Sequence, residues 1–171
     1  MPKNDARNVP GRGSATGSTP ATAALATAGV DHTVHPYDHD PAQTGFGLEA
    51  AAKLGVDPER ICKTLVVDTG DRLAVAVVPV SGQLDLKAMA AALGVKKVTM
   101  ADPARAARSS GYVVGGISPL GQKTILPTVI DDSARDHELM MVSAGRRGLQ
   151  VQLRPADLVA VTGARFAPIA T

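Results

Sequence analysis

The stretches ICKTLVVD (residues 61–68) and RLAVAVVPV (residues 72–80) are strongly apolar and are separated only by Thr69, Gly70 and Asp71. Both are rich in valine and in other residues that suit a pleated, buried surface. A three-residue connection that contains glycine is typical of a tight turn between antiparallel strands. The sequence therefore predicts a β-hairpin over residues 61–80.

Signals at helix ends predict five helices around this hairpin. A capping side chain before proline or before an apolar run marks a start at Thr19, Asp85 and Asp102, and glycine after the last apolar residue marks an end. The predicted helices cover residues 20–28, 46–54, 86–93, 103–110 and 155–161. Short apolar runs predict further strands at residues 33–37, 97–100, 112–114, 124–130, 138–143, 149–154 and 165–169.

The order of these elements indicates the fold class. Strands predominate, helices are interspersed and several turns are tight, so the sheet should be mixed and mainly antiparallel. A length of 171 residues suits one core, and we expect a single α/β (α+β) domain over residues 20–171. Residues 1–19 carry almost no apolar side chains and are predicted to form a disordered tail.

Composition narrows the class of protein. Trp is absent and Phe and Tyr number two each, which disfavours a single-stranded nucleic-acid platform of stacked aromatic rings. One cysteine cannot form an intramolecular disulfide, and no segment resembles a membrane span or a secretory signal. We therefore expect a cytoplasmic protein that does not engage a membrane.

Charge is unevenly distributed along the chain. Residues 20–95 carry 5 basic and 9 acidic side chains, whereas residues 96–171 carry 10 basic and 6 acidic ones. A basic face can attract phosphate, but scattered solvated charges give the same count.

The sequence gives little indication of a metal site. The histidines accompany neither a cysteine pair nor a His-Glu-x-x-His helix. Histidines in loops near aspartates, such as His35 and His39, are usually solvated. We expect neither a metal nor a cofactor.

Lys63 interrupts the first apolar strand of the hairpin. A lysine in such a run must reach solvent, pair with an acid or face a cavity, and the alternative to a functional role is a charge that protects an edge strand from aggregation. Neighbouring strand residues project to opposite faces, so Cys62 should not meet Lys63. Cys62 is predicted to be a small buried hydrophobic residue rather than an activated thiolate.

Two glycine-containing segments are further candidates. Residues 115–121 (GGISPLG) can adopt conformations with positive φ and present backbone groups to a ligand, although a plain connecting loop contains the same residues. The segment is not a phosphate-binding P-loop, because the Gly-Lys-Ser/Thr ending is missing. The turn at residues 143–148 carries Arg146 and Arg147, which suit phosphate recognition but are also common as exposed turn residues.

Taken in order, these segments resemble the YbaK/EbsC family of aminoacyl-tRNA deacylases, relatives of the editing domain inserted in bacterial prolyl-tRNA synthetases. The resemblance covers nearly all of residues 20–171, and its specificity lies in the ordered series. The matching segments are residues 37–40 (YDHD), 46–51 (FGLEAA), 63–65 (KTL), 94–98 (GVKKV), 111–112 (GY), 115–122 (GGISPLGQ) and 147–149 (RGL).

The resemblance implies a curved mixed sheet flanked by helices and hydrolysis of the ester that joins an amino acid to the terminal adenosine of tRNA. The members that this chain most resembles act on cysteine wrongly attached to proline tRNA, with prolyl-tRNA synthetase as a candidate partner. Carried over by position, Lys63 and Gly115 are predicted to be catalytic. The predicted substrate-binding residues are Tyr37, Thr64, Gly116, Ile117, Ser118 and Ser143.

Family chemistry also implies that the substrate's own thiol attacks its carbonyl, which removes the need for a catalytic base. Two alternatives remain open from the sequence: an alanyl-tRNA deacylase, and a non-catalytic RNA-binding or regulatory module that retains the pocket. The oligomeric state is open as well. Release of free amino acid from charged tRNA would distinguish an enzyme from the non-catalytic module. Comparison of cysteinyl and alanyl substrates would distinguish the two deacylases.

Overall fold

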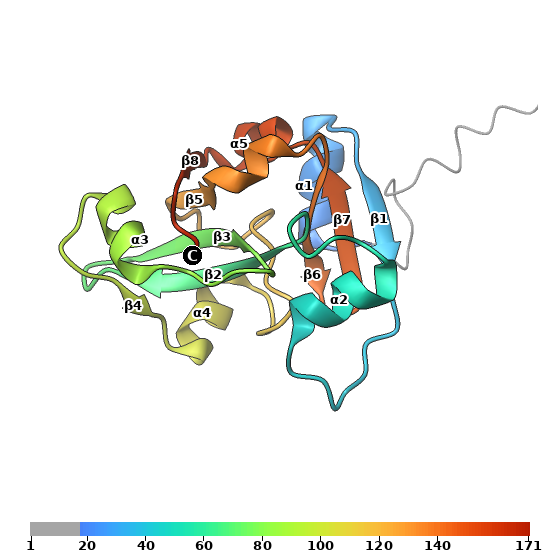
Figure 1. Ribbon diagram of the computed structural model, residues 1–171, viewed down its shortest axis with the longest axis horizontal. Coiled ribbons are helices and arrows are strands. Elements are labelled where there is room, and N and C mark those ends of the chain that lie inside the picture. The colour runs from blue at the N-terminus through green and yellow to red at the C-terminus, as the bar shows by residue number, and fades with distance from the viewer. Residues whose placement is uncertain (1–17) are drawn as a thin grey trace, which may run out of the picture.

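The computed structural model describes residues 18–171, so the predicted tail lies outside the described residues except for Ser18 and Thr19. Helices surround the strands of a mixed α/β domain (Figure 1). In chain order the elements are α1 (Pro20–Ala28), β1 (Thr33–Pro36), α2 (Phe46–Leu54), β2 (Cys62–Asp68), β3 (Leu73–Pro79), α3 (Leu86–Leu93), β4 (Thr99–Met100), α4 (Pro103–Ser110), β5 (Thr128–Asp131), the 3-10 helix η2 (Asp132–Asp136), β6 (Met140–Arg146), β7 (Leu149–Leu153), α5 (Pro155–Thr162) and β8 (Arg165–Ala167).

The predicted hairpin is confirmed. Strands β2 and β3 pair antiparallel from Cys62 opposite Pro79 to Asp68 opposite Leu73. The Asp68 carboxylate accepts a hydrogen bond from the Gly70 backbone N–H at 2.8 Å, and Gly70 has a φ of 96° that only glycine adopts readily. Every residue of β3 is buried, so this strand lies at the centre of the domain.

The predicted mixture of pairings is confirmed, but the strands divide into two sheets. One sheet has the order β4-β2-β3-β5-β8, with parallel pairs only at β3/β5 and β5/β8, and the other is the antiparallel sheet β1-β7-β6. A single parallel bridge joins them at Ile61 and Met141, where the Met141 N–H donates to the Arg60 carbonyl at 2.9 Å. Beyond this bridge β2 and β6 no longer pair, and a cavity opens between them.

Helix capping follows the sequence closely. The side chains of Thr19, Asp85 and Asp102 each accept a backbone N–H from the first turn of α1, α3 and α4, respectively, at 3.1 Å. These bonds satisfy donors that have no partner inside the helix. The three predicted helix starts are therefore confirmed.

The prediction of a strand at residues 112–114 is wrong. This segment forms turns, and Tyr112 is buried with its hydroxyl donating to the Leu120 carbonyl at 2.6 Å. The segment closes a loop over residues 112–127 instead of joining a sheet, and β5 begins only at Thr128, four residues later than expected. The helix η2 was not predicted, because four of its five residues are polar and the segment lacks an apolar period.

The core is aliphatic, as the composition predicts. Its largest cluster joins α1, both sheets and α5 through side chains such as Leu25, Val77, Val151 and Leu158. Smaller clusters lie under α3 and under α2. Among the described residues, no helix is long and apolar enough to cross a membrane.

Candidate active site

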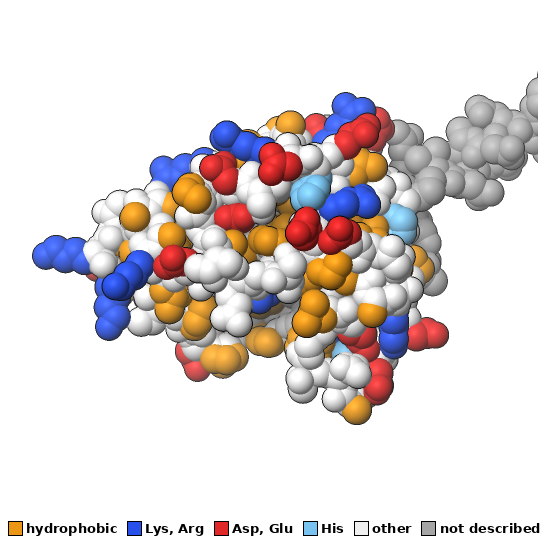
Figure 2. Space-filling view, in the orientation of Figure 1, with side chains coloured by type: hydrophobic (Ala, Val, Ile, Leu, Met, Phe, Trp, Pro, Cys, Tyr) orange, Lys and Arg blue, Asp and Glu red, His pale blue; other side chains and the backbone are white. Residues whose placement is uncertain are grey.

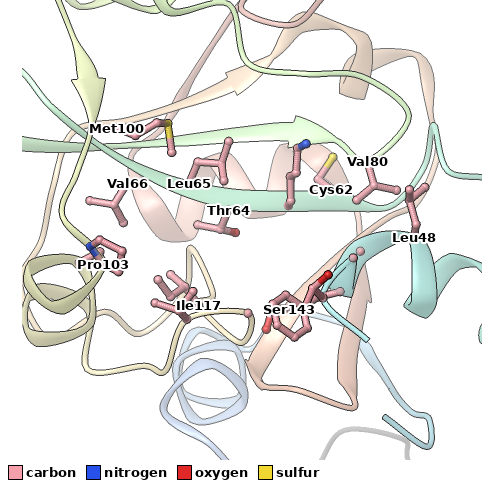
Figure 3. Close-up of a pocket in the computed structure, with 18 of the residues that line it drawn as sticks. Leu48, Cys62, Thr64, Leu65, Val66, Val80, Met100, Pro103, Ile117 and Ser143 are labelled. Atoms are coloured by element: carbon pink, nitrogen blue, oxygen red, sulfur yellow. The ribbon is translucent and has the colours of Figure 1, made fainter. Parts of the chain in front are cut away.

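A cavity of about 400 Å³ lies where the two sheets separate. Its walls come from the edge of β2, the N-terminal turn of α2, the β4–α4 connection, the loop after Val113, and β6 with β7. In Figure 3, β2 runs along one side, Ile117 and Ser143 lie opposite Thr64, and Leu48 and Met100 lie at opposite ends. Its size is in the range of small-molecule sites.

Lys63 lies on this cavity because the cavity follows the unpaired edge of β2. The side chains of Cys62 and Thr64 project from one face of the strand and that of Lys63 from the other, yet all three line the cavity. Lys63 is half-buried, and its side chain forms no ion pair or hydrogen bond with any described residue. Of the explanations available from the sequence, the structure supports a lysine that faces a cavity.

Two buried polar atoms in the cavity wall have no partner among the described residues. Thr64 Oγ1 and Gln150 Oε1 are buried and accept or donate no hydrogen bond in the described chain. Such groups are uncommon in proteins, since burying an unpaired polar atom is costly. Their place in a cavity wall suits groups that bind the polar parts of a ligand.

Gln150 is a site residue that the sequence did not indicate. It is 7% exposed and lies opposite Ser143 on one side and His35 on the other, so the three side chains form a polar row across the antiparallel sheet. Burial lowers the pKa of His35, which favours the neutral imidazole. The alternation in LQVQL (residues 149–153) suggests solvent-facing glutamines, and only the tertiary structure shows that residue 150 is covered.

The loop at Gly115 is held against its neighbours so tightly that a side chain does not fit. Gly115 has a φ of 88°, and a Cβ atom there would lie 2.7 Å from Phe46 Cε2 and 2.9 Å from Arg147 Nε. Gly116 is similarly close to the backbone of Arg146, and its carbonyl accepts a hydrogen bond from Ser143 Oγ at 2.9 Å. Glycine is therefore required at both positions, because the neighbouring atoms leave no room for a Cβ atom.

The Arg147 side chain holds this loop in place. Its Nε and Nη2 atoms donate to the Val114 carbonyl at 2.9 and 2.6 Å, and its guanidinium lies 4.7 Å from the centre of the Phe46 ring. Two of the Arg147 donors therefore hold the loop, and the phosphate-binding role that the sequence leaves open for the turn arginines stays a prediction. Planar stacking together with two hydrogen bonds that converge on one carbonyl oxygen is a geometry that lysine cannot provide.

A buried carboxylate fixes the helix that carries Phe46. Glu49 accepts from His39 Nδ1 at 2.6 Å and from the Asp40 backbone N–H at 2.9 Å, and Lys53 lies 3.5 Å from it. The hydrogen bond from His39 is the main cause that lowers the pKa of Glu49. The His39 ring in turn lies 5.6 Å from the Phe46 ring.

The structure brings together most of the predicted site residues. Lys63, Thr64, Gly115, Ile117 and Ser143 line the cavity. Gly116 lies directly behind it, bonded to Ser143.

Besides Gly116, two of the predicted substrate-binding residues do not line the cavity. Tyr37 packs against the apolar cluster under α2. Ser118 is fully buried, and its hydroxyl accepts the Leu120 N–H at 3.2 Å. Any role of these two residues in binding would be indirect.

Cys62 is not an activated thiol. Burial, and secondarily the charge of Asp131, raises the pKa of Cys62 to about 12, so the thiol stays protonated at neutral pH. We expect Cys62→Ala to keep deacylase activity within about threefold while losing about 1–2 kcal/mol of stability from the deleted sulfur. Treatment of the native protein with iodoacetamide at pH 8 should leave activity unchanged, and inactivation that Cys62→Ala prevents would show that the thiol is accessible and ionised.

Among residues 18–171, no group of three or more His, Cys, Asp or Glu side chains is arranged to hold a metal ion. The site therefore consists of one unpaired cation, a rigid glycine loop and a few unpaired polar groups. Such a set can bind and polarise a reactive ester, because its donors and charge are fixed in advance.

Comparison with known proteins agrees with this geometry. The sequence pattern of the aminoacyl-tRNA editing domain matches residues 43–161. A protein of Enterococcus faecalis named as a candidate Cys-tRNA(Pro)/Cys-tRNA(Cys) deacylase, EbsC, is 41% identical over 138 residues, which are 79% of this chain and 84% of that protein.

Two solved structures share the fold. A candidate trans-editing enzyme for prolyl-tRNA synthetase is 26% identical with a TM-score of 0.79, over 90% of this chain and 98% of that one. The hypothetical protein APE2540 is also 26% identical, with a TM-score of 0.80 over 90% of this chain and 100% of that one. By its sequence and its fold, the chain belongs to the family of aminoacyl-tRNA editing domains.

Proposed function

We propose that this protein is a trans-editing deacylase that removes cysteine wrongly attached to proline tRNA. One observation carries the proposal: a half-buried lysine with no carboxylate partner among the described residues faces a cavity beside a rigid glycine loop. The name of the Enterococcus relative supports cysteinyl-tRNA as the substrate.

The ester of an aminoacyl-tRNA is already activated, so the protein needs no strong nucleophile. It has to fix the ester and stabilise the negative charge that develops on the carbonyl oxygen. The Lys63 ammonium can bind that oxygen or the phosphate of the terminal adenosine. Either role explains why the cation has no carboxylate partner of its own, since a paired ammonium would be a weaker electrostatic group.

The Gly115 carbonyl is a free acceptor that the loop offers to the substrate. The Val114 carbonyl is engaged by Arg147 and the Gly116 carbonyl by Ser143, whereas no described residue donates to the Gly115 carbonyl. We assign this carbonyl to the α-ammonium group of the substrate. Thr64 Oγ1 and Gln150 Oε1, which are also unpaired, can bind the remaining polar atoms of the aminoacyl ribose.

The substrate thiol supplies the nucleophile in this proposal. The cysteine thiol loses its proton to solvent, its sulfur bonds to the ester carbonyl carbon, and the bond from that carbon to the ribose oxygen breaks. The ribose oxygen takes up a proton, which leaves uncharged tRNA and a cysteine thiolactone that water opens. A free thiol has a pKa of about 8.5, so a few per cent is thiolate at pH 7.

A panel of charged tRNAs tests the proposal. We expect release of cysteine from Cys-tRNA(Pro) to exceed release of serine from Ser-tRNA(Pro) by at least about 100-fold. Serine has nearly the same size, but its hydroxyl is far less acidic and does not attack. The measurement is single-turnover deacylation of each substrate, with and without prolyl-tRNA synthetase.

Each other outcome of the panel has a distinct meaning. Equal rates for cysteine and serine would mean attack by water. A fastest rate for Ala-tRNA(Pro) would favour the alanyl-specific enzyme. No release from any substrate would leave a non-catalytic RNA-binding module.

A further inference from the structure

One edge of β2 has backbone groups that face the cavity without a strand to pair with. β2 pairs with β3 along its whole length, but its other edge is covered only near the two ends. At one end Ile61 bridges to Met141 of β6, and at the other the Val66 carbonyl accepts the Ala101 N–H at 3.0 Å. The edge between these two contacts borders the cavity, whose lining includes residues 62–66.

The register of the hairpin decides which backbone groups point to that edge. In an antiparallel pair the N–H and C=O groups of successive residues point alternately toward the partner strand and away from it. The Val80 N–H donates to the Ile61 carbonyl at 2.9 Å, so the groups of Ile61 face β3. Alternation then turns the groups of Lys63 toward β3 and those of Thr64 and Val66 toward the cavity edge. The bond that Val66 makes across this edge agrees with that assignment.

Thr64 therefore directs both its backbone N–H and its backbone C=O into the cavity. Neither β4 nor β6 pairs with this residue, and no described residue of a loop bonds to its backbone. Its side-chain hydroxyl is buried and unpaired as well. In Figure 3 the Thr64 side chain points into the space that Ile117 and Ser143 border from the opposite side. One residue thus offers a donor and an acceptor that the sheet holds in fixed positions.

The uncovered edge is too short for a further strand. Only residues 62–65 separate the bridge at Ile61 from the bond at Val66, and only alternate residues among them point outward. Strands in globular proteins usually have about three to ten residues and pair through several of them. A ligand the size of a single amino acid fits this edge, and the cavity of about 400 Å³ has room for it.

An α-aminoacyl group is complementary to the two backbone groups of Thr64. Opposite residues of an antiparallel sheet exchange N–H···O=C bonds in both directions when they form a hydrogen-bonded pair. An aminoacyl ester carries the matching groups, an ammonium and a carbonyl attached to the same α-carbon. Acidic and basic side chains are interspersed on the face of the molecule in Figure 2, so surface charge there does not single out an ammonium group. Backbone groups inside the cavity can do so.

We propose that the Thr64 N–H donates a hydrogen bond to the ester carbonyl oxygen and that the Thr64 C=O accepts one from the α-ammonium group. This inference rests on the proposed function and adds a catalytic group to it. An ammonium has three donors, so it can bind the Gly115 carbonyl at the same time. The ester oxygen becomes negative when the substrate sulfur bonds to the carbonyl carbon. A backbone N–H that the strand holds in place stabilises that charge without having to reorient, alongside the Lys63 ammonium.

Recognition through the backbone makes no use of the substrate side chain. The edge of β2 would bind the part that all α-amino acids share, and the choice of cysteine would fall to the reactivity of its thiol. Serine bound in the same way would be held in place but would not react. Binding and chemical selection are therefore assigned to different groups.

Exchange of one backbone atom tests the N–H. Thr64 is replaced by valine in one protein and, by suppression of a stop codon, with the α-hydroxy acid that corresponds to valine in another, here called the ester variant. The two proteins differ only in the oxygen that replaces the N–H of residue 64. This N–H pairs with no strand, so the exchange removes no donor from the hairpin. Single-turnover release of cysteine from Cys-tRNA(Pro) should be about 100- to 1,000-fold slower in the ester variant than in Thr64→Val.

Two controls separate this loss from a general disturbance of the site. Uncharged proline tRNA has no ester carbonyl, so its dissociation constants for the ester variant and for Thr64→Val should agree within about twofold. An ester at Lys87 changes a backbone N–H in the first turn of α3, away from the cavity, and should leave the rate within about twofold of wild type. All rates are measured at a temperature at which melting curves show every variant to be folded.

Each outcome supports or overturns the contact. Equal rates for the ester variant and Thr64→Val would overturn it and leave the deacylase function intact. A slower rate with an equal loss of affinity for uncharged tRNA would indicate a distorted cavity and would also overturn it.

An analogue covers the case in which the wild type releases no amino acid from any charged tRNA. Cysteine joined to the terminal ribose by an amide keeps both the carbonyl and the ammonium group but resists cleavage. Thr64→Val should bind tRNA with this end about three- to tenfold more tightly than the ester variant does, the value of one hydrogen bond. With no turnover, that result would keep the contact and remove the enzymatic function, whereas equal affinities would remove both.

Discussion

Replacing Lys63 with alanine should lower kcat/KM for Cys-tRNA(Pro) by roughly 100- to 1,000-fold, the loss typical of removing one preorganised electrostatic contact to a developing oxyanion. The side chain faces the cavity and has no partner among the described residues, so its charge is free to act on the substrate. The stability of the fold should not decrease. A half-buried ammonium without a counter-ion stabilises nothing in the free protein, and its removal should leave the melting temperature unchanged or slightly raised.

Two further variants make this result specific. Lys63→Met keeps the length and apolar stem of the side chain without the charge, and it should lose as much activity as Lys63→Ala. Lys87→Ala removes an exposed lysine that does not line the cavity, and it should retain kcat/KM within about twofold. Activity of Lys63→Ala within tenfold of wild type would show that the cation is not the electrostatic centre of the site.

Gly115→Ala should be nearly as damaging as the loss of Lys63. The added methyl group would lie 2.7 Å from Phe46 and 2.9 Å from Arg147, and the φ of 88° is itself unfavourable for alanine. The loop must move, which displaces both the Gly115 carbonyl and the side chains of the mouth. A shift of about 1 Å at a site of this kind costs on the order of 100-fold in rate. Strain and overpacking together should reduce stability by about 2–5 kcal/mol.

Gly70→Ala provides the matched control. Gly70 has a similar φ of 96°, but nothing lies within 4 Å of the Cβ position, and the residue is in the turn between β2 and β3, away from the cavity. This variant should lose only about 1–2 kcal/mol, with no change in kcat. Urea unfolding and single-turnover deacylation at low temperature, where both variants stay folded, give the two quantities. Equal losses in the two variants would mean that close packing at Gly115 is unimportant.

Arg147 shows how residues at the mouth of the cavity are held in place. Its guanidinium fixes the Val114 carbonyl and covers Phe46, and Phe46 is in contact with His39, which is bonded to the buried carboxylate of Glu49. The loop and the start of α2 are therefore fixed relative to each other by side chains that do not line the cavity, with the exception of Phe46. This arrangement explains how the loop and the start of α2 can be held in place at the cavity before substrate binds.

Local signals in the sequence were sufficient for most of the secondary structure. Caps at Thr19, Asp85 and Asp102 and the turn at Gly70 all act within a few residues, so their geometry can be read from neighbouring residues alone. The segment at residues 112–114 was mispredicted because Tyr-Val-Val has the composition of a strand. Burial of the Tyr112 ring and its bond to Leu120 decided the conformation instead.

The sequence by itself determined the hairpin, the mixed mainly antiparallel pairing, the anomaly at Lys63 and, through its ordered motifs, the family. Only the tertiary structure decided that the strands part after the Ile61–Met141 bridge, that a cavity fills this gap, and that Arg147, Phe46 and Gln150 line or support it. The physical reason is the separation in sequence between the residues that are in contact. Periodicity and caps report contacts between residues a few positions apart, whereas the cavity depends on contacts between β2 and segments about 50 to 90 residues further along the chain.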